Sequence, residues 1–166
     1  MTTSKRFKDC SRKTRRRITG SLIALCLPFS LLAQLGESVA KVTPPETLAL
    51  KRGSTATQNL RVTLRSGFHV NSDKPKDEFL IPLKLTWTGP LQVQKVVYPK
   101  PEEVKVGNDM LNVLTGSFEI QTHFLAPAQA TAGVSLMEGK LHYQACDNQS
   151  CKRPATLSVQ LPVSIQ

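Results

Sequence analysis

Helical periodicity is missing from this sequence: no segment of ten or more residues gathers its apolar side chains on one face of a helix. Internal repeats and low-complexity segments are missing as well. Cysteine is scarce, with four residues in a chain of 166, so the core of the folded part must hold without a framework of cross-links. The length therefore predicts a leader followed by one domain with an ordinary hydrophobic core.

A basic surface is also missing from most of the chain, although the formal net charge is +10. Residues 1–40 contain eight lysines and arginines and two acidic residues, which is a net charge of +6. The other 126 residues contain 14 basic and 10 acidic side chains, a net charge of only +4. The positive charge belongs to the N-terminal segment, so nucleic acid is not predicted as a partner.

Residues 1–40 have the three parts of a bacterial export signal. A basic region ends at Arg17, an uncharged apolar run covers residues 18–36, and small residues stand at Ser38 and Ala40. We expect cleavage after Ala40. Retention as an inner-membrane anchor is the alternative, because the apolar run is just long enough to cross a bilayer. Either way we expect the domain at residues 41–166 in the periplasm, an oxidising compartment in which paired cysteines form disulfides.

Apolar and polar residues alternate in several short runs of residues 41–166, which predicts half-buried β-strands. The apolar positions of these runs are Leu60, Val62 and Leu64; Leu83, Leu85 and Trp87; Phe118, Ile120 and Phe124; and Leu157, Val159, Leu161, Val163 and Ile165. Turns that contain glycine and proline separate the runs. We therefore expect an all-β domain, an immunoglobulin-like antiparallel β-sandwich of roughly seven to nine strands. The Cys-Trp-Cys spacing of antibody domains is missing, so Trp87 is predicted simply as a core residue.

Cys146 and Cys151 are the two cysteines outside the leader, and four residues separate them. Alternating runs on both sides place the pair at the mouth of a β-hairpin. A disulfide here closes so small a ring that it contributes roughly 2 kcal/mol on the chain-entropy relation, which is little for a structural cross-link. The adjacent Lys152 and Arg153 would stabilise a thiolate, the reactive form in disulfide exchange. These features favour a redox-active pair, and a structural hairpin disulfide stays open as the alternative.

A third interpretation of the pair is a soft metal site, for example for copper. His142 lies four residues before Cys146 on the predicted strand, and His69 or His123 could add a further ligand. Histidines scattered over strands are more often ordinary surface or core residues. We therefore expect neither a metal nor another cofactor.

Four segments of the chain share a pattern with one family. They read GFHVNSDKP at residues 67–75, FLIPL at residues 79–83, VYPKP at residues 97–101, and YQAC at residues 143–146, followed by Cys151 and Pro154. Together they resemble the N-terminal periplasmic domain of the transmembrane thiol-disulfide reductase DsbD and its stand-alone relatives. The resemblance covers nearly all of residues 41–166, and the hairpin around the two cysteines is its most specific part.

The resemblance implies an immunoglobulin-like fold and a role as a component of protein-disulfide reduction, in which Cys146 and Cys151 cycle between disulfide and dithiol. Electrons would come from a membrane-embedded thiol reductant and pass to periplasmic thioredoxin-like or disulfide isomerase proteins. Cys146 is expected to form the mixed disulfide. We expect a separate protein to supply the electrons. The alternative is a non-catalytic immunoglobulin-like binding module whose hairpin disulfide only shapes a loop.

The resemblance also assigns residues around the cysteine pair. Four residues are expected near the site: His69 and Asn71, which take the places of two aromatic residues of the family, together with Tyr143 and Lys152. A cap loop that covers the sulfurs in the family corresponds here to Glu102, Glu103 and Val104. The family has an aromatic residue at the tip of this loop, and valine offers less apolar area to shield the disulfide.

Overall fold

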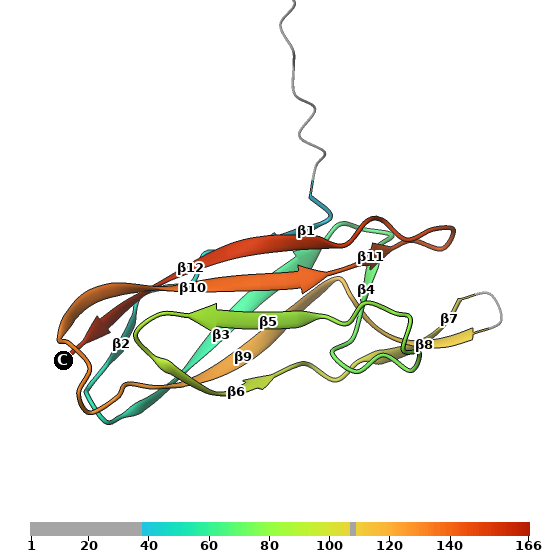
Figure 1. The fold of residues 1–166 in the computed structure, drawn as a ribbon. Helices are drawn as coiled ribbons and strands as arrows, with labels where there is room; N and C mark the ends of the chain where they lie inside the picture. The colour runs from blue at the N-terminus through green and yellow to red at the C-terminus, as the bar shows by residue number, and fades with distance from the viewer. Residues whose placement is uncertain (1–37, 107–108) are drawn as a thin grey trace, which may run out of the picture. The chain divides into compact units, whose positions relative to one another are not determined.

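Strands are the regular secondary structure of this computed structural model, which describes residues 38–106 and 109–166 (Figure 1). They are β1 (Ala40–Val42), β2 (Leu48–Leu50), β3 (Thr55–Leu64), β4 (His69–Asn71), β5 (Lys84–Thr88), β6 (Gln92–Val97), β7 (Glu102–Val106), β8 (Asp109–Thr115), β9 (Ser117–Leu125), β10 (Gly133–Tyr143), β11 (Ala145–Cys146) and β12 (Ala155–Ile165). The described residues thus form twelve strands rather than the seven to nine expected, because several strands are only two or three residues long. The predicted all-β, immunoglobulin-like fold class is confirmed.

The described strands form three four-stranded sheets. Two of them, with strand orders β1-β3-β9-β6 and β2-β12-β10-β5, make the sandwich. The third has the order β11-β4-β8-β7 and lies at the end of the domain away from the C-terminus (Figure 1). It is this third sheet that holds the first of the two cysteines.

The longest ladder joins β10 and β12, which pair antiparallel over all eleven residues of each strand. The cysteine loop is the connection between these two strands, so it stands on the most extensively paired element of the fold. One pair departs from the expected antiparallel arrangement, since β2 runs parallel to β12. The chain leaves the first sheet after β1 and joins the second at β2, and Pro44 and Pro45 between these strands have no N–H group for a strand ladder.

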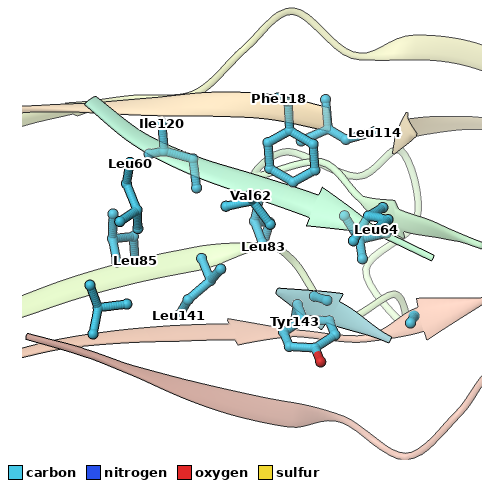
Figure 2. Close-up of a cluster of buried hydrophobic side chains, with 14 residues drawn as sticks. Leu60, Val62, Leu64, Leu83, Leu85, Leu114, Phe118, Ile120, Leu141 and Tyr143 are labelled. Atoms are coloured by element: carbon cyan, nitrogen blue, oxygen red, sulfur yellow. The ribbon is translucent and has the colours of Figure 1, made fainter. Parts of the chain in front are cut away.

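Alternate side chains of the facing strands fill the core, as the period of two predicts. Figure 2 shows Leu60 and Val62 of β3 and Ile120 of β9 on one side of this core, and Leu85 of β5 and Leu141 of β10 on the other. Each of these five side chains is at most 3% exposed. This burial of apolar area stabilises the frame independently of any sulfur chemistry.

Trp87 contacts both hydrophobic clusters of the core, in agreement with its predicted role. Its ring meets Phe124 edge to face with 5.5 Å between the ring centroids, and its Nε1–H donates a hydrogen bond of 3.1 Å to Thr122 Oγ1. On β10, Gly139 leaves the space that the indole occupies. A Cβ atom at that position would lie only 2.7 Å from Cζ3 of Trp87.

The predicted export signal lies almost entirely in residues 1–37, outside the described residues. Ala40 is described, begins β1 opposite Leu64, and is 1% exposed. Cleavage after Ala40 and a domain boundary at residue 41 stay predictions. Within residues 38–106 and 109–166 there is no helix of the length and apolarity needed to cross a membrane.

Candidate functional site

The two cysteines form a disulfide in the short loop between β10 and β12. Cys146 ends β11, Cys151 lies five residues later, and their Cα atoms are 3.9 Å apart. The two residues also face each other as an isolated antiparallel bridge. The loop therefore has the hairpin form that the flanking alternation predicts.

Hydrogen bonds close the cysteine loop without help from the sulfurs. Asp147 N–H donates to the carbonyl oxygen of Ser150 at 2.9 Å, and Lys152 N–H donates to that of Ala145 at 2.8 Å. The Asp147 carboxylate accepts hydrogen bonds from the N–H groups of Gln149 and Ser150 at 2.9 and 2.7 Å. These N–H groups, and then the charge of Lys152 at 3.8 Å, hold the pKa of Asp147 below its ordinary value.

The two cysteines differ in exposure. Cys146 is 4% exposed because β11 packs beside β4, whereas Cys151 is exposed at the end of the loop. A thiolate of another protein must reach the sulfur that it attacks, so Cys151 is the accessible member of the pair. This favours the opposite of the sequence-based expectation, which assigned the mixed disulfide to Cys146.

His69 lies directly opposite Cys146 in the antiparallel pairing of β4 and β11, and opposite Thr115 of β8 on its other side. Directly paired residues project from the same face of a sheet, so the side chains of Cys146, His69 and Thr115 share one face. Glu102 of β7 extends this polar row, since its Oε2 atom accepts a hydrogen bond of 3.3 Å from Thr115 Oγ1. His69 is 6% exposed, and burial lowers the pKa of its imidazole while the charge of Asp147 opposes that shift.

Asn71, two residues further along β4, is buried on the same face as His69. Its Nδ2 donates a hydrogen bond of 3.0 Å to the carbonyl oxygen of Ile81, while its Oδ1 atom is buried and has no hydrogen-bond partner among the described residues. The hydrogen bond from Asn71 therefore holds the segment between β4 and β5 next to this face of the sheet. Of the two residues expected to flank the disulfide, His69 is the one paired with Cys146.

The segment expected to be a cap loop is a strand. Glu102, Glu103 and Val104 belong to β7, the strand furthest from β11 in the third sheet. Three strand spacings separate β7 from β11, which is about 14 Å across the sheet. Glu103 forms an ion pair with Lys76 at 2.8 Å, which lowers the pKa of the Glu103 carboxyl through a hydrogen bond and the lysine charge. The segment is a strand because β7 pairs with β8, a contact that a charged five-residue run does not reveal.

Two grooves border the cysteine loop. One, of about 450 Å³, is lined by Val104, by His69 and by Asn148 of the loop. The second, of about 570 Å³, is lined by Ala145 and by three cations, Arg65, Lys152 and Arg153. Val104 therefore forms a wall of the first groove, and covering of the sulfurs by this segment stays a prediction.

Phe68 and Arg65 belong to the site but were not singled out from the sequence. The Arg65 guanidinium lies 4.7 Å from the centroid of the Phe68 ring, and Lys152 Nζ lies 5.7 Å from it. The aromatic ring beside the loop is thus supplied by Phe68, one residue before His69. The sequence feature that could have indicated Phe68 is its place in the GFH string at residues 67–69, which is part of the family pattern.

Three other residues named from the sequence, Tyr143, His142 and His123, form hydrogen bonds with neighbouring side chains. Tyr143 is 3% exposed within the core, and its hydroxyl shares a hydrogen bond of 3.2 Å with Ser38 Oγ. His142 shares a hydrogen bond of 3.1 Å with Thr156, and His123 shares one of 3.1 Å with Thr57. Over residues 38–106 and 109–166 no three His, Cys, Asp or Glu side chains gather as metal ligands.

Comparison with known proteins decides the family. The sequence model described as "Thiol:disulfide interchange protein DsbD, N-terminal" matches residues 39–162, which is well over half of the chain. The chain belongs to this family. This match confirms the resemblance that was identified from the four sequence segments. A search of curated proteins gave no match.

Solved structures agree with the fold. The N-terminal periplasmic domain of ScsB from Proteus mirabilis is 16% identical, with a TM-score of 0.51 over 74% of this chain and 44% of that one. The chain thus spans less than half of the ScsB chain that it matches. The DsbD N-terminal domain of Neisseria meningitidis in the reduced form is also 16% identical, with a TM-score of 0.45 over 72% of this chain and 84% of that one. At these identities the likeness concerns the fold alone.

Proposed function

We propose that this protein is an exported thiol-disulfide exchange module that relays electrons through Cys146 and Cys151. The electrons come from a membrane-embedded thiol reductant and pass to periplasmic thioredoxin-like or disulfide isomerase proteins. The observation that carries the proposal is a disulfide between one exposed and one buried cysteine, in a loop closed by its own hydrogen bonds, on a member of the DsbD N-terminal family. A periplasmic location is supported by the three-part leader and by the periplasmic domain of ScsB that shares the fold.

The different exposure of the two cysteine residues suggests an order for the exchange. A thiolate of the electron donor attacks Cys151 Sγ, the bond to Cys146 breaks, and Cys146 leaves with the electron pair as a thiolate. The second donor thiol then attacks its own sulfur in the mixed disulfide, which releases Cys151 as a thiolate and leaves the donor oxidised. Two electrons enter the domain, and the same steps in reverse pass them to a client disulfide.

The charges near Cys151 favour its role as the reacting sulfur. Lys152 and Arg153 follow it directly, and cations near a sulfur stabilise the thiolate that attacks and leaves in exchange. Asp147 offsets part of this effect through its contact with Lys152. The ring closed by the disulfide is small enough that its loss removes only about 2 kcal/mol of stability, so opening it during each cycle is compatible with a folded domain.

Trapping of the mixed disulfide tests this proposal. Cys146→Ser keeps the exposed sulfur and removes the one that would release the partner, so it is expected to accumulate an adduct with a thioredoxin-like protein that lacks its own second cysteine. Cys151→Ser is the matched control and is expected to give little adduct, because the remaining sulfur is buried. Non-reducing electrophoresis and intact mass distinguish the two. An adduct with Cys151→Ser alone would reverse the order of the sulfurs, and no adduct with either variant would contradict the relay.

A further inference from the structure

The buried cysteine has a histidine as its direct cross-strand neighbour. Cys146 and His69 are paired in the register of β11 and β4, an arrangement that brings their Cβ atoms to about 5 Å on one face of the sheet. Both residues are almost fully buried, at 4% and 6% exposed. The cations that could stabilise a thiolate, Lys152 and Arg153, follow the other cysteine.

This burial raises a question of proton transfer. When the reduced domain passes its electrons on, Cys151 attacks a client disulfide and Cys146 must then displace the client from Cys151. Only the thiolate of Cys146 can do so, and its thiol proton has little access to water in the position that the structure gives it. A basic group beside Cys146 is therefore needed for this second step to be fast.

We infer that His69 is the general base for Cys146 in the step that releases the client. The inference rests on the proposed function. In this step the His69 imidazole takes the Cys146 thiol proton, the thiolate attacks Cys151 Sγ, and the sulfur of the client leaves with the electron pair. The disulfide reforms, the client sulfur is reduced, and the imidazolium passes its proton to the client thiolate or to solvent. In the reverse direction the imidazolium returns a proton to Cys146 as it leaves.

The charged groups around His69 suit a base. Burial favours the neutral imidazole at neutral pH, which is the form that can accept a proton, and the carboxylate of Asp147 favours the imidazolium that is formed. Arg65 lines the same groove and Lys152 lies beyond Phe68, while Glu102 stands at the far end of the polar row beyond Thr115. The carboxylate of Asp147, within the cysteine loop, thus favours the His69 imidazolium. The positive charges of Arg65 and Lys152 disfavour it.

Reaction of the reduced full chain with oxidised glutathione isolates the step. Glutathione first forms a mixed disulfide with Cys151, and Cys146 then releases it. The second reaction is intramolecular, so its rate does not depend on the glutathione concentration. Quenched samples analysed by intact mass give the population of the glutathione adduct with time. His69→Gln keeps the approximate size of the side chain but cannot take the proton, and His142→Gln is the matched control on β10.

At pH 7 we expect glutathione release to be roughly tenfold or more slower in His69→Gln than in the wild type, so that the adduct accumulates, while His142→Gln behaves as the wild type. The defect is expected to shrink as the pH rises towards about 9, because hydroxide then removes the thiol proton. A general loss of packing would not be repaired by alkaline pH. Equal release rates for the two variants would overturn the role of His69 and would leave the proposed exchange function intact.

The wild type provides a second measurement that does not depend on whether a variant folds. Its release rate is expected to rise with pH to a plateau, with a midpoint below the ordinary histidine value of 6.5. A rate that continues to rise in proportion to hydroxide beyond pH ~8 would overturn the inference. Failure of oxidised glutathione to convert the reduced wild type to the Cys146–Cys151 disulfide would instead overturn the proposed exchange function, and the inference with it.

Discussion

Removal of the sulfur-sulfur bond is expected to weaken this domain without unfolding it. The perturbation is Cys146→Ala together with Cys151→Ala, and reduction of the wild-type protein is its matched comparison. The bond joins residues separated by five positions, and the chain-entropy relation gives about 2 kcal/mol for so small a ring. The loop keeps its hydrogen bonds, including those at the Asp147 carboxylate, and the paired strands on either side of it remain.

A loss of about 2 kcal/mol corresponds to a decrease in Tm of roughly 5–10 °C for a domain of this size. Thermal unfolding followed by circular dichroism would give Tm for the oxidised wild type, the reduced wild type and the double variant. We expect one cooperative transition for each, with the reduced wild type close to the variant. The difference between these two reports the effect of replacing the buried Cys146 side chain, separately from the bond. If the reduced protein were unfolded at room temperature, the pair would be structural and this reasoning would be refuted.

Three further changes test the fold and the surroundings of the site. Gly139→Ala is expected to cost about 1–3 kcal/mol of stability and to alter the fluorescence of Trp87, because its Cβ would lie 2.7 Å from the indole; an unchanged melt would contradict the observed packing. Asp147→Ala removes an acceptor for two loop N–H groups. Since the folded pKa of Asp147 lies below the ordinary 3.8, its stabilisation is present above about pH 4 and is lost as the pH falls through the folded pKa. The difference in Tm between wild type and variant should therefore narrow in acid, and a constant difference would argue against the carboxylate as its source. Glu102→Gln with Glu103→Gln is expected to leave the rate of oxidation of the reduced pair by a small disulfide unchanged, because β7 lies about 14 Å across the sheet from β11; faster oxidation would support a role of these carboxylates in covering the sulfurs.

The sandwich could be predicted from the sequence because its main signal is local. Strands with one face in the core alternate apolar and polar residues every second position, and the runs that end in Leu64 and Ile165 show this without any knowledge of their partners. The short strands of the third sheet give no such signal. All three residues of β4 are buried, and β7 is a charged run that becomes a strand only through its pairing with β8.

The cysteine pair could likewise be found from the sequence, whereas its asymmetry could not. Spacing and neighbouring cations pointed to Cys146 and Cys151, but which sulfur is exposed depends on the pairing of β11 with β4, more than seventy residues earlier in the chain. The same holds for Phe68, whose ring contacts Lys152 across a similar separation. Contacts of this kind are set by the tertiary fold and leave no periodic trace in the sequence.

The reduction potential of the Cys146–Cys151 disulfide tests the proposed relay most directly. It can be measured by equilibrating the protein with thiol-disulfide buffers of known potential and quantifying the oxidised and reduced forms after acid quenching. A pair that relays electrons is expected to have a potential well above about −300 mV, within the range of other exchange proteins. A potential below about −300 mV would identify a structural disulfide and contradict the proposed function.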